Sequence, residues 1–327
     1  MKEAIESREL FVLDGLGVVV RGTYHKTPAD NSGAQSNLKS DRLGVLFISS
    51  LFPTRAANGD SAVYWADSFA ANGYPSFRLD CPGFGDSDGD PPPGLFEFIN
   101  RGGYGPILSA KIKELIARFH LSGVVIVGLC AGAVSAIWTS AASTDCRGMI
   151  LMNPYFYLPQ AARPNFRERL SAWSLQTHLG GVLSKCYAHL KEIRLFLSRK
   201  SLPKNANYLL LRRFKELASA GLPILIVNGK DRKSPAMKSK IGEFDYLAHV
   251  LKSSGRRGQI VVRTVEGADH SLSNRLGRLG AKEHAEQWLN ARFPLTDRQG
   301  AVISTTHRNP GDSENGCACR EQVLNCN

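Results

Sequence analysis

The stretch VVIVGLCAGAVSAIWTSAA, residues 124–142, decides how the rest of this sequence is interpreted. It begins with four β-branched residues, typical of a strand buried on both faces, and it ends in small residues that predict a helix over 131–142. Between them, residues 128–132 (GLCAG) place Cys130 between two glycines. A sharp strand-to-helix turn needs such glycines because it is strained and a Cβ on either side would clash with its neighbours. We therefore interpret Cys130 as a nucleophile held at an elbow.

A serine is the second candidate for the nucleophile. Residues 85–89 (GDSDG) match the G-x-S-x-G pattern literally, with Ser87 at the centre. The carboxylates of Asp86 and Asp88 flank this serine and would oppose an alkoxide or an oxyanion. The prolines at 91–93 also prevent a helix from starting directly after it. A buried cysteine is often only a small apolar residue, but the strand and the helix on its two sides favour Cys130 over Ser87.

Strand and helix patterns alternate along the chain on both sides of the elbow. Such alternation predicts right-handed crossovers and a mostly parallel sheet. The expected strands are an opening hairpin over 11–13 and 17–24, then 43–49, 74–80, 124–127, 148–152, 223–227 and 259–265. The expected helices cover 61–72, 108–119, 131–142, 241–251 and 276–293.

A basic segment interrupts this alternation after residue 157. Residues 158–220 contain twelve Lys or Arg against three acids, and therefore nine of the twelve net positive charges of the chain. We interpret 158–220 as a helical basic cap inserted into a core formed by 1–157 and 221–294. Its charge could attract an anionic ligand through Arg199, Lys200, Arg212 and Arg213, or it could be an ordinary solvated helix face. The polar tail, 295–327, is expected to be disordered.

Composition and charge exclude several classes of protein. The chain of 327 residues has 41 Lys and Arg against 29 Asp and Glu, but it has no motif typical of nucleic-acid binding. Seven cysteines are too few for a disulfide scaffold and suit a reducing compartment. The cysteines of the tail fit no structural zinc spacing, so we expect neither a metal nor a cofactor. Without a secretory signal or an apolar run of about 20 residues, the expectation is a cytoplasmic protein with no membrane span.

A base and an acid follow Cys130 in the chain. His270 lies in a turn-rich loop after the strand expected over 259–265, which makes it the preferred general base. Asp231 follows the strand over 223–227 and is the preferred acid, which would orient the imidazole and offset its charge. The other strand end, at Met152, leads to Asn153 and Pro154 and offers no carboxylate. Cys130, Asp231 and His270 thus give the chain order nucleophile, acid, base.

An oxyanion formed at Cys130 needs two hydrogen-bond donors. The N–H of Ala131 is one, because it follows the nucleophile directly at the start of a helix. The second is expected from Leu51 or Phe52, after the strand over 43–49. The same helix end is expected to favour a thiolate at Cys130.

These motifs together resemble the α/β-hydrolase superfamily, particularly its bacterial serine-aminopeptidase-like and lysophospholipase-like branch. The resemblance runs from about Gly44 to Phe293 and rests on the loop before Ser61, on residues 78–89, on the Cys130 elbow, and on Asp231 with 267–270. It implies an eight-stranded, mostly parallel α/β sheet flanked by helices, a lid between strands six and seven, and acyl chemistry at the carboxyl ends of the strands. Most members carry serine at the elbow; cysteine there resembles the dienelactone hydrolases.

The expected activity is cleavage of an ester, lactone or thioester by the triad Cys130, His270 and Asp231. A thiolate attacking an acyl carbon forms a thioester, which water or an acceptor then attacks. The substrate would be a small acyl compound, and an anionic or CoA- or carrier-linked one would suit the basic cap. The alternatives are a catalytically silent member that binds a small molecule or a protein, and a non-hydrolytic use of the same fold.

Overall fold

The computed structural model of this chain describes residues 7–31, 42–49, 54–158, 205–230, 240–241, 244–245 and 259–295. Most of the basic cap, residues 159–204, and the tail from 296 onward lie outside the described residues. The two expected domain boundaries, at 157/158 and 220/221, therefore stay predictions.

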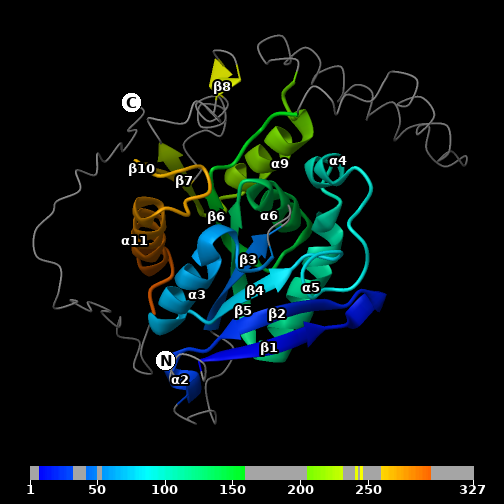
Figure 1. Ribbon diagram of the computed structural model, residues 1–327, viewed down its shortest axis with the longest axis vertical. Helices are drawn as coiled ribbons and strands as arrows, with labels where there is room; N and C mark the ends of the chain where they lie inside the picture. Colours follow the sequence, from blue (N-terminus) through cyan, green and yellow to red (C-terminus); the bar gives the residue numbers. More distant parts are fainter. Residues whose placement is uncertain are drawn as a thin grey trace, which may run out of the picture.

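Eight strands form one sheet in the order β1-β2-β4-β3-β5-β6-β7-β10 (Figure 1). The hairpin of β1 (Arg8–Leu13) and β2 (Val20–His25) lies at one edge, and β2 pairs antiparallel with β4. All pairings from β4 to β10 are parallel. The bounds of these six strands are Arg42–Ser49 (β3), Ser76–Asp80 (β4), Leu121–Leu129 (β5), Cys146–Met152 (β6), Ile224–Lys230 (β7) and Ile260–Glu266 (β10). The predicted fold class, a mostly parallel eight-stranded α/β sheet, is confirmed.

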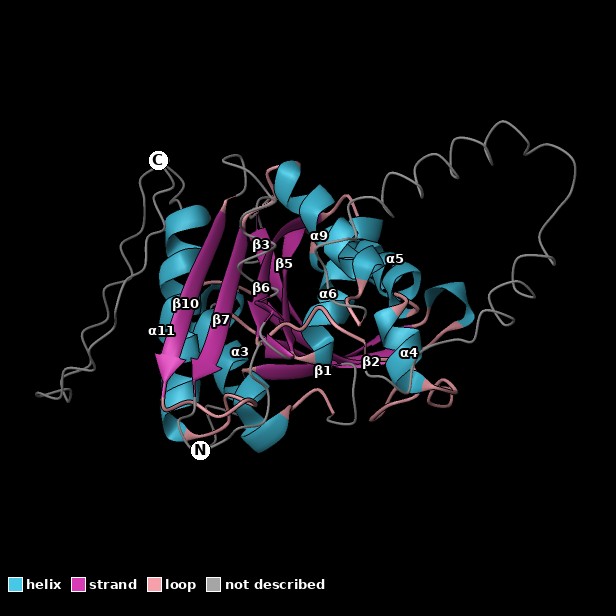
Figure 2. Cartoon of the chain, turned by 90° about the horizontal axis from the view of Figure 1, so that it is seen from above, coloured by secondary structure: helices cyan, strands magenta, loops and turns pink. Residues whose placement is uncertain are grey.

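Helices cover both faces of the sheet (Figure 2). On one face lie α3 (Ser61–Ala71) and α11 (Arg275–Arg292), which contribute Trp65 and Trp288 to the core. The other face carries α4 (Leu95–Asn100), α5 (Tyr104–Phe119), α6 (Ala131–Ala142) and α9 (Tyr208–Ser219). Successive strand residues point to opposite faces. For this reason Val124 and Ile126 of β5 enter one core cluster, whereas Val125 and Val127 enter the other.

Two local expectations differ from the structure. The helix expected over 241–251 is wrong at its start, because Ile241 and Phe244 pair antiparallel between β8 (Lys240–Ile241) and β9 (Phe244–Asp245). Gly242, between them in sequence, is a poor helix former and suits a tight turn. The helix α4 was not expected from the sequence. It begins immediately after Gly94, whose φ of +61° is easy for glycine.

The described part of the basic cap is residue 158 and residues 205–220, which include α9. The apolar side of α9, with Leu210, Phe214 and Ala218, belongs to the same core cluster as α5 and α6. The side chain of Asn207 caps the helix by accepting a hydrogen bond from the N–H of Leu210. No helix among the described residues is long and apolar enough to span a bilayer.

Candidate active site

Cys130 occupies the turn between β5 and α6 with a strained backbone. Its φ of 54° and ψ of −112° lie in a region that non-glycine residues rarely adopt. Such a conformation costs about 1–3 kcal/mol and persists only where the surroundings fix it. Here the N–H of Cys130 donates to the carbonyl oxygen of Met152 at the end of β6, at 2.8 Å. The residue is therefore held as a sharp elbow at the carboxyl end of the central strands.

The two glycines of the elbow let α6 approach the sheet closely. A Cβ on Gly128 would lie 2.3 Å from the carbonyl oxygen of Gly132, and a Cβ on Gly132 would lie 2.3 Å from that of Ile48 in β3. Both contacts are with backbone atoms, which cannot move aside as a flexible side chain could. The steric reason expected from the sequence agrees with this geometry.

Burial disfavours the ionised form of the Cys130 sulfur. Burial raises the pKa of the thiol above its ordinary value of 9.0, and a hydrogen bond from the N–H of Ala131 offsets part of that effect. This differs from the thiolate expected at a helix N-terminus, because the loss of hydration outweighs the single backbone donor. The N–H of Ala131 thus points to the sulfur, and its role as the first oxyanion donor stays a prediction.

His270 lies in the loop between β10 and α11. The N–H of Gly267, at the start of that loop, donates to the carbonyl oxygen of Lys230 at 2.9 Å, which ties the loop to the end of β7. Burial lowers the pKa of His270 below 6.5, and the negative charge of Asp269 opposes this. Its Nε2 atom is buried and has no hydrogen-bond partner among the described residues, so it is not hydrogen-bonded to the Cys130 sulfur.

A short bridge connects the backbone of Cys130 to that of His270. Met152 accepts the N–H of Cys130, and the next residue, Asn153, donates from Nδ2 to the carbonyl oxygen of His270 at 2.7 Å. The Oδ1 atom of Asn153 also accepts the N–H of Gly229 in β7, at 2.9 Å. The structure thus places the predicted nucleophile and base at the carboxyl ends of β5 and β10, and the bridge runs through the end of β6, one of the two strands between them.

The hydrogen bonds that Asn153 makes to Gly229 and His270 could not be predicted from the sequence. There, the residue only shows that no acid follows the strand ending at Met152. One signal was present: asparagine tolerates positive φ and often bonds to nearby backbone groups. Its φ is 47°.

The remaining predicted site residues are mostly outside the described part of the chain. This holds for Asp231, Leu51, Phe52, Arg199 and Lys200. Asp231 directly follows Lys230, which pairs with Glu266 where β7 and β10 end. Its assignment as the acid stays a prediction.

A family model described as the alpha/beta hydrolase family matches residues 46–276. The chain belongs to the α/β-hydrolase family. A comparison with curated proteins found no match. Among solved structures, an esterase of Pyrococcus furiosus is 14% identical with a TM-score of 0.57, over 89% of this chain and 93% of that one. DcsB, solved in complex with a substrate analogue, is 14% identical with a TM-score of 0.51, over 88% of this chain and 99% of that one. At such identities the likeness shows the fold alone.

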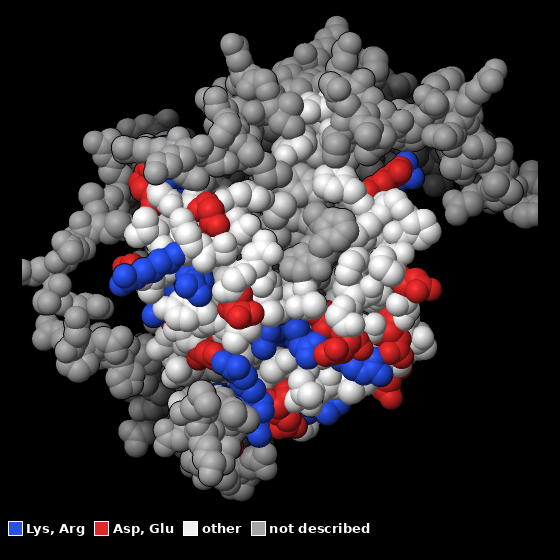
Figure 3. All heavy atoms as spheres, in the orientation of Figure 1, with Lys and Arg blue, Asp and Glu red and all other residues white. Residues whose placement is uncertain are grey.

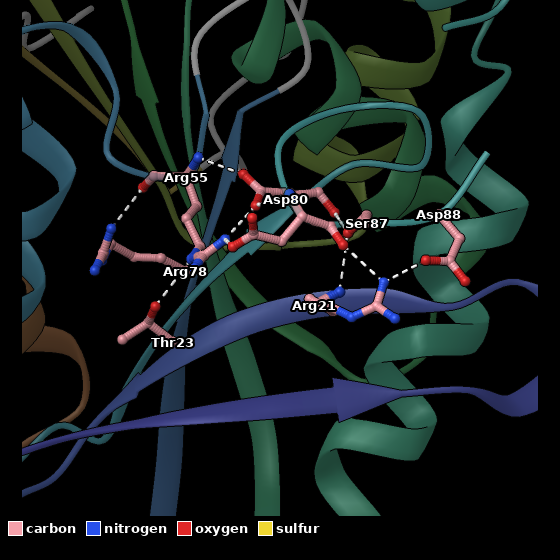
Figure 4. Close-up of polar contacts among 8 residues, drawn as sticks. Arg21, Thr23, Arg55, Arg78, Asp80, Ser87 and Asp88 are labelled. Carbon is pink, nitrogen blue, oxygen red and sulfur yellow. Dashed lines mark hydrogen bonds and ion pairs between the residues drawn. The ribbon is translucent and has the colours of Figure 1, made fainter. Parts of the chain in front are cut away.

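In this α/β-hydrolase-family chain the competing serine has a structural role (Figure 4). The Ser87 hydroxyl donates to the carbonyl oxygen of Asp80 at 2.8 Å and accepts the N–H of Arg21 at 2.9 Å. The side chain is buried. Both hydrogen-bonding capacities of the hydroxyl are occupied, which agrees with the choice of Cys130.

Asp80 organises the end of β4 beside the site (Figure 4). Its fully buried carboxylate forms an ion pair with Arg55 and accepts the backbone N–H of the same residue at 2.6 Å. Arg78 donates to the carbonyl oxygen of Arg55 at 3.0 Å and to Nε2 of His25 at 2.7 Å. These contacts fasten the segment that follows β3 to β4. The expected second oxyanion donors, at residues 51 and 52, lie between β3 and Arg55 in sequence, outside the described residues.

Tyr155 and Tyr157 belong to or pack against the core cluster on which Cys130 lies. Tyr155 is buried, stacks on Phe96 at a ring distance of 5.7 Å, and contacts Tyr157 at 5.3 Å. Burial raises the pKa values of both tyrosines, and the charge of an ionised Cys130 would raise them further. Cys130 packs against the same core cluster. The surroundings of the sulfur are therefore largely apolar.

Two of the three described basic residues of the cap are paired, and the third is Lys215. Arg212 and Arg213 both contact Glu216, at 2.7 and 2.8 Å. On the face of Figure 3, the described Lys and Arg side chains are interspersed with Asp and Glu. Among the described residues, no group of three or more His, Cys, Asp or Glu is arranged to hold a metal ion.

Proposed function

We propose that this protein is a cysteine-dependent hydrolase or acyltransferase that acts on an ester, lactone or thioester. Cys130 is the nucleophile, His270 the general base and Asp231 the orienting acid. The observation that carries the proposal is the bridge through Met152 and Asn153. It joins a strained cysteine to a histidine whose buried Nε2 has no hydrogen-bond partner in the described structure.

Because burial disfavours the charged forms of Cys130 and His270, the first step starts from a thiol and a neutral imidazole. As the sulfur attacks the acyl carbon, Nε2 of His270 accepts the thiol proton, and the resulting imidazolium then protonates the leaving group. The N–H of Ala131 and a second donor, from Leu51 or Phe52, hold the oxyanion. The acyl group remains on Cys130 as a thioester until water or an acceptor attacks it, with His270 again removing the proton.

Membership of the α/β-hydrolase family and the apolar surroundings of Cys130 both support acyl chemistry on a small molecule. The finer placement is a part of the proposal: a serine-aminopeptidase-like or lysophospholipase-like relative with cysteine at the elbow, as in dienelactone hydrolases. An anionic or CoA- or carrier-linked substrate would use the basic cap, through Arg199, Lys200, Arg212 and Arg213. No cofactor takes part.

The test is a panel of p-nitrophenyl esters, acyl-CoA thioesters and lactones assayed on the wild type and on Cys130→Ala. We expect turnover by the wild type, loss of at least about 1,000-fold in Cys130→Ala, as expected when a covalent nucleophile is removed, and an acyl adduct on Cys130 by mass spectrometry. Equal turnover by both proteins would reject the proposal. A wild type without turnover would favour the silent alternative if its Cys130 also reacted with iodoacetamide at the same rate as in His270→Ala.

A further inference from the structure

Asn153 makes two side-chain hydrogen bonds of opposite polarity at the end of β6. Its Oδ1 accepts the N–H of Gly229 at 2.9 Å, and its Nδ2 donates to the carbonyl oxygen of His270 at 2.7 Å. Its own N–H donates to the carbonyl oxygen of Val227 at 2.9 Å. One side chain thus connects β6, β7 and the loop that follows β10.

The loop around His270 has other anchors, but they act on other residues. Asn58 donates to the Ser271 hydroxyl at 3.0 Å, and the carboxylate of Asp269 accepts the N–H and the hydroxyl of Ser273, each at 2.7 Å. Among the contacts described for the loop, the amide of Asn153 is the one that holds the peptide group of His270 itself.

The bridge also fixes the position of the Cys130 backbone relative to the His270 backbone. Met152 accepts the N–H of Cys130 through its carbonyl oxygen, and the next residue holds His270. The backbones of Cys130 and His270 are therefore both bonded to two consecutive residues, Met152 at the end of β6 and Asn153 directly after it. A displacement of about 1 Å in a reacting group can cost about 100-fold in rate, so such bonding matters for catalysis.

We propose that Asn153 is a positioning residue that holds the backbone of His270 so that its imidazole can reach the Cys130 sulfur. The proposal rests on the proposed function. The amide is suited to the task because it supplies one acceptor and one donor in a fixed orientation. A carboxylate keeps the acceptor for Gly229 but turns an oxygen toward the carbonyl oxygen of His270.

Two variants separate this role from a contribution to folding. Asn153→Asp keeps the size of the side chain and the bond to Gly229 but loses the donor to His270. Asn153→Gly removes both bonds and accommodates the φ of 47° without strain. Asn58→Ala is the matched control, because it removes an anchor of the same loop that does not act on His270.

The experiment measures kcat and KM on the best ester of the panel, the rate of Cys130 alkylation by iodoacetamide against pH, and the thermal midpoint. We expect both Asn153 variants to lose about 10–100-fold in kcat with little change in KM. Their alkylation profiles should move toward that of His270→Ala, while Asn58→Ala stays near the wild type.

Wild-type kcat and an unchanged alkylation profile in folded Asn153→Asp and Asn153→Gly would overturn the inference, even if their thermal midpoints fell. Equal losses in Asn58→Ala would also overturn it, because any loosening of the loop would then suffice. If Cys130→Ala or His270→Ala retains full turnover, the proposed function fails instead, and the two failures are thereby distinguished.

Discussion

At the scale of single residues, the candidate site combines a strained backbone at Cys130 with two side chains, Cys130 and His270, whose charged forms are disfavoured by burial. Burial raises the pKa of Cys130 and lowers that of His270, so both shifts oppose a resting thiolate–imidazolium pair. The proton must then move during the attack itself, as it does in serine hydrolases. The strained turn holds the half-buried Cys130 at the carboxyl end of β5.

The protonation of His270 should set the acid limb of activity. A buried imidazole resists charging, so kcat/KM should fall only as the pH drops through a value below 6.5. The charge of Asp269 raises the pKa of His270, and Asp269→Asn should therefore move the midpoint further down. Glu283→Gln, which removes an exposed carboxylate from α11, is the control. A midpoint above 6.5, or an upward shift in Asp269→Asn, would contradict this assignment.

The strain at Cys130 predicts an unusual order of stability. Glycine adopts a φ of 54° and a ψ of −112° without the penalty that alanine pays. Cys130→Gly should therefore unfold with a free energy about 1–2 kcal/mol larger than that of Cys130→Ala, the reverse of the usual order in and near helices. Urea denaturation of the two variants checks this. An alanine variant at least as stable as the glycine variant would show that the elbow relaxes.

At the scale of elements, what could be predicted depends on how local the signal is. The β5–α6 elbow was predictable, because its strand, glycines and helix lie within residues 124–142 and need no distant partner. The helix α4 and the β8–β9 pairing were not, since short segments are decided by the surface on which they pack. The bridge through Asn153 depends on three strand ends that meet only in the folded sheet.

The ion pair of Asp80 and Arg55 joins the end of β4 to the segment that follows β3. Asp80 is fully buried, and removing its charge leaves the largely buried Arg55 with one charged partner among the described residues, the exposed Asp86. Asp80→Asn should therefore lower the free energy of unfolding by about 3 kcal/mol. Asp86→Asn, which removes the exposed partner of the same arginine, should cost less than about 1 kcal/mol. Similar losses in both variants, measured in urea, would contradict the difference in burial.

At the scale of the whole molecule, charge and core are divided along the chain. The described strands and helices form the two-sided core, whereas nine of the twelve net positive charges belong to residues 158–220. Beyond its first residue, residues 205–220 of that segment are described, and the two arginines of α9 share Glu216. The whole fold class could be predicted because alternation of strand and helix runs through the sequence; the role of the basic segment could not.

A role of the basic cap in substrate binding makes a prediction that depends on the charge of the substrate. Neutralising Arg199, Lys200, Arg212 and Arg213 to glutamine should raise KM for acyl-CoA thioesters about 10-fold at low salt, and the difference should shrink as salt is added. KM for neutral p-nitrophenyl esters serves as the internal control and should stay constant. An unchanged KM for the anionic substrates would assign these residues to a solvated surface.

The raised pKa of the Cys130 thiol also affects how readily this residue is oxidised. Hydrogen peroxide and most electrophiles attack thiolates rather than thiols, and the resulting sulfinic and sulfonic acids are essentially irreversible. Because burial raises the pKa of Cys130, a smaller fraction of its sulfur is thiolate at a given pH than in an exposed cysteine, and such oxidants have less to react with. The burial that disfavours ionisation of Cys130 would thereby also protect its sulfur from oxidation.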